Sequence, residues 1–250
     1  MADKNILSQT DTRAPKKIDK EKTKQETAKL LEILDELQNR LYASATHSVL
    51  MVIQGMDASG KDGLVRDVLG QLNPQGVTVK SYKAPTAEEL SHDFLWRIHI
   101  ATPPKGMIQV FNRSHYEDIL VTRVHGWCDD KLAKKRMKAI NSFESLLQEH
   151  NNTIILKLYL HISKEEQHER LKERMVDPTK MWKYNEKDWA ESEKWEDYMK
   201  MYEDCFANCN DIPWNIIPAD QNWYKEHLVA KLLVEKLQEL DLQYPTLKKA

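Results

Sequence analysis

An apolar run followed at once by a glycine-rich loop and a helical pattern is the feature that most constrains how this chain can fold. Residues 49–53 read Val-Leu-Met-Val-Ile, the composition of a buried strand. Gly55, Gly60 and Lys61 then follow with the Gly-x4-Gly-Lys spacing of a phosphate-binding loop, or P-loop. Apolar residues return at helical spacing at Leu64, Val65, Val68 and Leu69. This order predicts backbone N–H groups that surround a phosphate, with Lys61 reaching the bridging and terminal phosphates.

Two acidic residues distinguish this loop from most P-loops. Asp62 stands where the residue after the lysine is usually Ser or Thr, whose hydroxyl binds Mg²⁺. A carboxylate is a stronger ligand for that ion, so Asp62 and, inside the loop, Asp57 predict a site for Mg²⁺ or Mn²⁺. The alternative is structural: an acid favoured by the helix dipole at position 62 and a turn residue at position 57.

Composition limits the kind of partner that the chain can have. With 250 residues, 41% hydrophobic and 30% charged, it is long enough for one sizeable α/β domain. A formal net charge of −2 provides no global field for nucleic acid or an anionic membrane, so a polyanion site must be a local cluster of cations. The first twenty residues lack the apolar core of a secretory signal, and no apolar stretch is long enough for a membrane span, so we expect a cytoplasmic protein. The cysteines are expected to be reduced, packed thiols at Cys128, Cys205 and Cys209.

The remaining pattern predicts a single domain over residues 19–250, after a disordered polar tail at 1–18. Leucines at helical spacing predict an amphipathic helix over 20–45, a packing element or a contact in a homo-oligomer. Further strands are predicted at 77–82, 107–111, 153–162 and 214–217, and further helices from the capping box of Thr86 and Glu89 to 100, from 129 to 150 and from 222 to 240. Alternating strands and helices indicate a parallel sheet covered on both faces, with ligands at its carboxyl end.

A second cluster of charged residues follows the strand predicted at 107–111. Arg113 can bind phosphate oxygens with its planar guanidinium, and Glu117 and Asp118 can bind metal or orient an attacking phosphate. Arg123 lies one or two helical turns further on. A solvated or salt-bridged surface is the alternative for the two acids and for Arg123.

A third cluster lies in a predicted helical lid at about 165–200. The segment 170–183 carries five cations against two anions, and it leaves a helix before Pro178. The cations are Arg170, Lys172, Arg174, Lys180 and Lys183. A lid that brings arginines to a developing charge fits phosphoryl transfer, whereas a solvated helix is the alternative. For the basic helix at 131–138, the solvated face is the favoured interpretation.

These motifs occur in one order that resembles the polyphosphate kinase 2 family, over about residues 25–240. They are the P-loop at 55–63, Leu-Trp-Arg at 95–97 with Pro-Pro-Lys-Gly at 103–106, the segment 111–118, and Lys-Glu-Arg at 172–174 leading to 177–183. The resemblance implies a P-loop kinase-like three-layer α/β/α sandwich, akin to thymidylate kinases, with a parallel sheet of about five strands, a helical lid and an N-terminal helix. It also implies Mg²⁺-dependent, reversible transfer of a terminal phosphoryl group from inorganic polyphosphate to a nucleotide.

The resemblance and the clusters together give the expected site. The expected catalytic residues are Asp57, Lys61, Asp62, Arg113, Glu117, Arg170 and Arg174, with Asp57 and Asp62 as metal ligands. The expected phosphate-binding residues are Gly55, Ala58, Ser59, Gly60, Lys61, Gly63, Arg113, Arg123 and Lys183. Asn112 departs from the Asp of family members that act only on diphosphates, so that Asp's role does not transfer. With Glu117 nearby, the chain looks more like members that accept AMP or GMP, or both these and ADP or GDP.

Two other functions fit parts of the pattern. An ATP-dependent nucleotide or nucleoside kinase of the same fold would use the basic lid to bind ATP. A P-loop regulatory switch is a third interpretation, but the sequence has no Asn-Lys-x-Asp guanine motif; residues 185–188 read Asn-Glu-Lys-Asp, the same letters in the wrong order.

Overall fold

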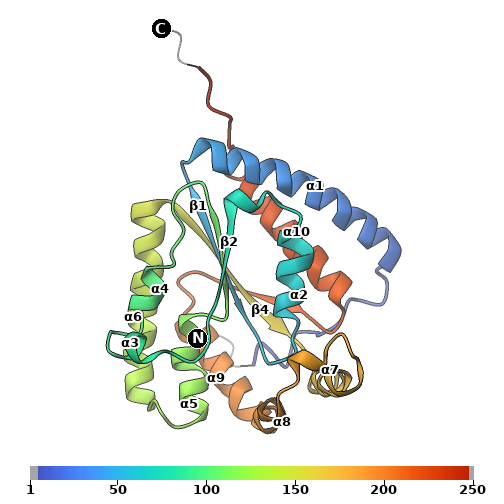
Figure 1. The fold of residues 1–250 in the computed structure, drawn as a ribbon, viewed down its shortest axis with the longest axis vertical. Coiled ribbons are helices and arrows are strands. Elements are labelled where there is room, and N and C mark those ends of the chain that lie inside the picture. Colours follow the sequence, from blue (N-terminus) through green and yellow to red (C-terminus); the bar gives the residue numbers. More distant parts are fainter. Residues whose placement is uncertain (1–4, 248–250) are drawn as a thin grey trace.

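A computed structural model describes residues 5–247 and shows a parallel sheet between two layers of helices (Figure 1). The strands are β1 (Ser48–Gln54), β2 (Val77–Ser81), β3 (Ile108–Asn112), β4 (Thr153–His161) and β5 (Trp214–Pro218). The α-helices are α1 (Lys20–Ser44), α2 (Lys61–Leu64), α3 (Ala87–Leu90), α4 (Trp96–His99), α5 (Val121–Val124), α6 (Asp130–Asn151), α7 (Lys164–Val176), α8 (Glu186–Ser192), α9 (Trp195–Asn208) and α10 (Asn222–Gln238). A π-helical turn, η1 (Val65–Leu69), continues α2, and the 3₁₀ turns are η2 (Pro74–Gly76), η3 (His115–Ile119) and η4 (Met181–Lys183). The predicted α/β sandwich is confirmed.

The sheet has the order β2-β3-β1-β4-β5, and every neighbouring pair is parallel. β1 lies at its centre, with Val52 paired to Phe111 of β3 and to Lys157 of β4. β1 leads into α2 on one side of the sheet, whereas β3 leads toward α6 on the other (Figure 1). Loops that leave neighbouring strands in opposite directions open a crevice at the carboxyl ends. The P-loop therefore begins where this fold binds ligands.

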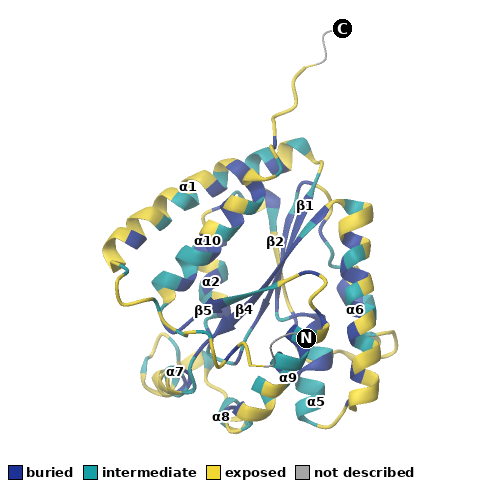
Figure 2. Ribbon diagram, turned by 180° about the vertical axis from the view of Figure 1, so that it is seen from behind, coloured by how far each residue is buried: buried dark blue, intermediate teal, exposed yellow. Residues whose placement is uncertain are grey.

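Burial follows the position of each strand in the sheet. All residues of β1 and β3 are buried, whereas most of the edge strand β2 is exposed, as Figure 2 shows. Continuous apolar runs are typical of parallel strands because helices cover both faces. The three cysteines are free and buried, as predicted. Among residues 5–247, no helix combines the length and the apolar character that crossing a bilayer requires.

The predicted N-terminal helix is confirmed as α1, which packs along α10 (Figure 1). Leu34, Leu37 and Leu41 are its buried leucines, and they share one face at helical spacing. The outer face of α1 is exposed (Figure 2). A role of this helix in a homo-oligomer stays a prediction.

Residues 5–18 contact the domain at a few positions, and most of their side chains are exposed. The disordered tail stays a prediction, and its first four residues lie outside the described part. Leu7 is 5% exposed and belongs to the hydrophobic core. Its N–H donates to Glu203 Oε1 at 2.7 Å, and Thr12 Oγ1 donates to Asp220 Oδ2 at 2.9 Å. Apolar burial and these hydrogen bonds offset the entropy lost on holding Leu7 and Thr12 in place. A polar composition does not reveal such partners, which lie about 200 positions away along the chain.

The helix predicted from Thr86 to residue 100 is divided in two, which corrects that prediction. The capping box of Thr86 and Glu89 is present and opens α3. The chain then leaves the helix and returns to it only at α4. Between them, Asp93 Oδ1 accepts a hydrogen bond from the N–H of Leu95 at 2.9 Å. A short acidic side chain that binds nearby backbone favours a turn over continued helix.

The predicted start of the lid at about residue 165 coincides with the start of α7 at Lys164, whereas its predicted end at about 200 falls inside α9. α7 ends at Val176, directly before Asp177 and Pro178, and α8 follows after the short turn η4. Proline restricts the residue before it to extended conformations, and Asp177 has a ψ of 112°. Figure 1 shows α7 and α8 together beyond the ends of the central strands.

Candidate functional site

The P-loop adopts a conformation that requires glycine at two places. Gly55 and Gly60 have φ angles of 150° and 91°, and a Cβ at Gly60 would lie 2.6 Å from Lys225 Nζ. Ala58 also has a positive φ of 62°, which is strained for a residue with a side chain. Gly60 is the N-cap of α2, and no side chain of the described residues caps that helix start. The first N–H groups of α2 therefore remain available to an anion. Gly63 lies in the same first turn.

Lys61 is buried inside this loop. Its Nζ donates to the carbonyl oxygens of Gly55 at 2.8 Å and Met56 at 3.0 Å, and the buried Ser59 hydroxyl lies 3.5 Å away. Burial, assisted by the charge of Arg113, lowers the pKa of Lys61 to about 8. The ammonium is thus mostly charged at neutral pH and loses its charge in the mildly alkaline range.

Arg113 links the end of β3 to the P-loop. Its N–H donates to the carbonyl of Ile53 in β1 at 3.1 Å, and its φ is 62°. Its Nη2 donates to Asp57 Oδ1 at 2.5 Å. The two predicted residues are therefore brought together, with the guanidinium beside the phosphate-binding loop. A non-glycine residue in the left-handed region is costly and is often found at functional sites.

Asp62 joins the loop to a strand end and to the lid. Its Oδ1 accepts from Asn112 Nδ2 at 2.8 Å, and its Oδ2 accepts from Lys183 Nζ at 3.0 Å. Burial acts to raise the pKa of this carboxyl, but the hydrogen bonds from Asn112 and Lys183 outweigh it and lower the pKa. Asp62 is therefore ionised across the neutral range. Asn112 has a direct contact with the unusual acid of the P-loop.

Glu117 also faces this crevice, whereas Asp118 does not. Burial raises the pKa of Glu117, and the charges of Arg113 and Lys61 act against that rise. Gln54 Nε2 donates to Glu117 Oε1 at 2.9 Å when its amide is oriented to satisfy its neighbours. The Asp118 carboxylate instead lies 3.6 Å from Arg97, away from the P-loop.

Arg170 fastens the base of the lid to the P-loop. Its Nη1 donates to the carbonyl of Ala58 at 3.1 Å. Its Nη2 donates to the carbonyls of Ala219 and Asp220, each at 2.8 Å, while its Nε binds Glu166 at 2.9 Å. This predicted cation is therefore at the loop, but it is held by backbone oxygens.

Arg174, one turn further along α7, pairs with an acid of α8 that sequence analysis missed. Arg174 Nη1 donates to Asp188 Oδ2 at 2.6 Å. Burial raises the pKa of Asp188, and the negative charge of Asp57 raises it further. Its only local signal was its place in a charged helix, where acids are usually solvated.

Two more residues at the loop were not predicted. Gln167 Nε2 donates to the carbonyl of Asp57 at 3.0 Å, and Lys225 Nζ donates to the carbonyl of Gly60 at 3.2 Å. Lys225 is 1% exposed. A lysine in an ordinary terminal helix carries no sequence signal of this contact, because the contact depends on tertiary packing.

Arg123 binds two aspartates in this structure, and its role in phosphate binding stays a prediction. Its Nη1 donates to Asp204 and its Nη2 to Asp130, each at 2.7 Å, so its guanidinium joins α5 to α6 and α9. On α6, four lysines are exposed, which agrees with the interpretation of that face as solvated: Lys131, Lys134, Lys135 and Lys138. Arg136 instead donates to the carbonyl of Asp118 at 2.7 Å.

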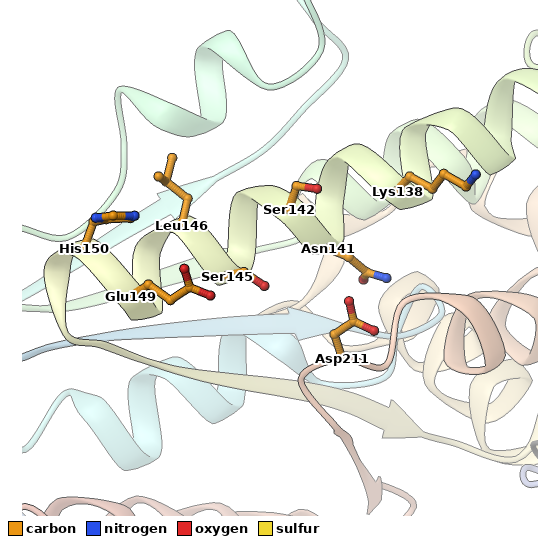
Figure 3. Close-up of a pocket in the computed structure, with 8 residues that line it drawn as sticks. All are labelled: Lys138, Asn141, Ser142, Ser145, Leu146, Glu149, His150 and Asp211. Atoms are coloured by element: carbon orange, nitrogen blue, oxygen red, sulfur yellow. The ribbon is translucent and has the colours of Figure 1, made fainter.

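A surface depression of about 570 Å³ lies on α6, separate from these residues (Figure 3). It is lined by Lys138, Asn141, Ser142, Ser145, Leu146, Glu149, His150 and Asp211. None of the predicted catalytic or phosphate-binding residues lines it. The second half of α6 precedes the start of β4, so the depression lies toward the amino end of that strand, away from the P-loop.

The donor atoms at the P-loop fit a magnesium ion that is shared with substrate. Among the described residues, no group of three or more His, Cys, Asp or Glu side chains is placed to hold a metal. Asp57 and Asp62 nevertheless offer two carboxylates on one short loop. Mg²⁺ is usually held by one or two carboxylates together with substrate phosphates and water. The set is thus suited to an ion that arrives with a phosphate chain.

Comparison with known proteins identifies relatives over most of the chain. The pattern that describes the family Polyphosphate kinase 2 (PPK2) matches residues 17–245. An AMP/ADP-polyphosphate phosphotransferase of Meiothermus ruber is 46% identical over 214 residues, which are 85% of this chain and 80% of that protein. An ADP-polyphosphate phosphotransferase of Rhodopseudomonas palustris is 42% identical over 229 residues, which cover 86% and 79% of the two chains.

The fold agrees with the same assignment. The crystal structure of polyphosphate kinase 2 from Arthrobacter aurescens superimposes with a TM-score of 0.94 and 42% sequence identity, over 98% of this chain and 89% of that one. The agreement extends over both the sheet and the lid, since nearly the whole chain is covered. The chain belongs to the polyphosphate kinase 2 family.

Proposed function

We propose that this protein transfers the terminal phosphoryl group of inorganic polyphosphate to AMP and ADP, reversibly and with Mg²⁺. The observation that carries the proposal is the Asp62 carboxylate, which binds the β3 end through Asn112 and the lid through Lys183. An acid in this position suits a substrate that brings metal and much negative charge. The relatives from Meiothermus and Rhodopseudomonas, named as polyphosphate phosphotransferases of AMP/ADP and of ADP, support this substrate class.

Different residues of the site would position the polyphosphate donor and the phosphoryl group that moves to the nucleotide acceptor. The N–H groups at the start of α2 and the Lys61 ammonium would bind the terminal phosphate of the donor. Arg113, placed beside Asp57, would bind oxygens of the phosphoryl group as it moves toward the acceptor. Because little covalent chemistry is asked of the protein in phosphoryl transfer, alignment of donor and acceptor accounts for most of the rate.

Magnesium would be held by Asp62, with Asp57 as the second carboxylate. When bound, the ion would neutralise phosphate oxygens and lower the cost of bringing two polyanions together. In this structure the Lys183 ammonium binds one oxygen of Asp62. When that oxygen binds the metal, the ammonium would move from the carboxylate to the phosphate chain. Arg174 would likewise exchange Asp188 for phosphate as the lid closes.

The range of acceptors follows from the strand end at 112–117. Asn112 donates to Asp62, which an Asp in its place could not do without a proton or a cation between the two acids. Glu117 lies beside Arg113 and Lys61, where it can orient a nucleotide phosphate. We therefore propose that AMP and then ADP present their terminal phosphate to one donor site.

The test is a matrix of donors and acceptors. Purified protein with Mg²⁺ is given polyphosphate or ATP as donor and AMP, ADP, GMP or GDP as acceptor, and the products are separated by chromatography. We expect ATP from AMP with polyphosphate, with ADP as an intermediate. Turnover with ATP but none with polyphosphate would instead support the ATP-dependent nucleotide kinase, and no turnover at all would support a binding module.

A variant sharpens the acceptor part of the proposal. Glu117→Ala should lower AMP phosphorylation several-fold more than ADP phosphorylation, because the shorter acceptor depends more on a group that orients it. Asp118→Ala is the matched control, since that acid faces Arg97. If the rates of AMP and ADP phosphorylation fall equally, Glu117 does not contribute to the choice between these acceptors.

A further inference from the structure

Lys225 is a buried cation without an acidic partner. It lies in the first turn of α10 and is 1% exposed. Its Nζ donates to Asn222 Oδ1 at 2.9 Å and to the carbonyl of Gly60 at 3.2 Å. Among the described residues, no carboxylate lies within 4.0 Å of this ammonium. Buried lysines are usually paired with an acid, so this arrangement calls for another source of negative charge.

A second cation converges on the same point of the P-loop. A Cβ on Gly60 would lie 2.6 Å from Lys225 Nζ and 3.4 Å from Arg170 Nη1. Arg170 Nη1 binds the carbonyl of Ala58, and Lys225 binds that of Gly60, so each holds the backbone of the loop. The positive charges of Lys225 and Arg170 repel each other, which costs free energy. A bound anion would offset that cost because it attracts both.

We propose that Lys225 is a positioning residue for the polyphosphate donor: it holds the carbonyl of Gly60 and, with Arg170, supplies positive charge beside the loop that favours a chain of phosphates. This inference rests on the proposed function, because it assigns the charge to that donor. A nucleotide acceptor carries one or two phosphates and enters beside β3, so its binding depends little on this lysine. The effect should therefore appear in the KM of polyphosphate.

The charge of Lys225 is sensitive to pH in the neutral to alkaline range. Burial, together with the charge of Arg170, lowers its pKa to about 8. The other charged groups that face it are Arg66 and Asp67 from η1 and Glu226 from α10. A polyanion favours the charged form, so binding of polyphosphate above pH 8 requires uptake of a proton and becomes weaker. Lys61 contributes the same dependence, so removal of one lysine should reduce the slope without abolishing it.

The experiment compares Lys225→Met with Lys231→Met. The control removes the same positive charge from an exposed lysine on the same helix. Initial rates are measured with polyphosphate varied at saturating AMP, and with AMP varied at saturating polyphosphate. Lys225→Met should raise the KM of polyphosphate about tenfold while kcat and the KM of AMP change less than about twofold. Lys231→Met should match the wild type.

Lys225→Arg separates this role from a merely structural one. It restores a charge that does not titrate, so the KM of polyphosphate should return to near the wild-type value and rise less steeply above pH 8. If Lys225→Met does not fold, the pH profile of Lys225→Arg decides alone. A lower melting temperature with an unchanged KM of polyphosphate, or an unchanged pH slope in Lys225→Arg, would overturn the inference. If the wild type does not use polyphosphate, the proposed function itself fails.

Discussion

The cations of this site are placed in two different ways. Lys61 begins α2 after the P-loop that leaves β1, and Arg113 directly follows β3. Carbonyl oxygens of the P-loop hold the Lys61 ammonium, and the Arg113 guanidinium binds Asp57 of the same loop. Arg174 and Lys183 belong to the lid, and each binds a carboxylate of another element. The first pair is held at the P-loop, which the sheet supports, whereas the second belongs to a separate helical element that must exchange a protein acid for a phosphate. Sheet-borne cations should therefore set the chemical rate, and lid cations should couple that rate to closure.

The largest effect is expected for the sheet. Lys61→Ala should lower kcat by about a hundredfold or more and leave the fold intact, because it removes a buried cation from the transferred phosphate. Circular dichroism and steady-state rates measure both parts, with Lys134→Ala on the exposed face of α6 as the control. Retention of near wild-type kcat at saturating Mg²⁺ would contradict this division of roles.

Asp62 belongs to both regions, so its variant tests their connection. Asp62→Asn should lower kcat by about a hundredfold and raise the Mg²⁺ concentration needed for half-maximal rate, since a neutral amide is a weaker ligand. A Mg²⁺ titration of the rate is the measurement. An unchanged Mg²⁺ requirement would mean that Asp62 only anchors Lys183 and Asn112.

For the lid, a smaller loss is expected. Arg174→Ala should lower kcat about ten- to thirtyfold while the KM of the nucleotide changes little, because the arginine acts after binding. Lys131→Ala on α6 is the matched control. Similar small effects in both variants would support the interpretation of α7 as an ordinary solvated helix. They would also contradict the proposed difference between lid cations and sheet cations.

The smallest effect concerns pH, and activity and stability should move in opposite directions. The pKa values of Lys61 and Lys225 are lowered from 10.5 to about 8, so above pH 8 the positive charge in and beside the P-loop is lost and kcat/KM should fall. Between pH 8 and 10.5 the unfolded chain holds more protons at these lysines than the folded chain does. Their contribution to the free energy of unfolding therefore rises with pH. Denaturant titrations of wild type and Lys61→Met at pH 7.5 and 9.5, pH values chosen to bracket a pKa of about 8, should show a smaller rise in the variant.

Local pattern was enough to predict the sheet, the P-loop and the end of α7 before Pro178. The apolar run of β1, the glycines at 55 and 60, and Pro178 each act on their own neighbours in sequence, so each can be recognised without the fold. The prediction also placed Arg113 at the loop, because carboxyl ends of parallel strands meet at one edge.

What the sequence did not predict depends on distant partners. Lys225 meets Gly60 across 165 positions, and Asp188 binds Arg174 only because the chain turns between α7 and α8. Arg123 was expected at the phosphate, but two aspartates from other helices bind it. A charged side chain carries the same local signal whether it binds a ligand, another side chain or solvent.

The segment at residues 5–18 has a consequence for how the molecule forms. Leu7 and Thr12 bind Glu203 and Asp220, so the contacts join residues separated by 196 and 208 positions. Asp220 is also the residue whose carbonyl accepts from Arg170. Contacts between distant positions form late, because a long stretch of chain must be ordered before they can close. During synthesis, residues 5–18 therefore cannot form these contacts until the chain has been made to about Asp220. A folding intermediate can bury the central strands while Arg170 still lacks its hydrogen bond to the carbonyl of Asp220.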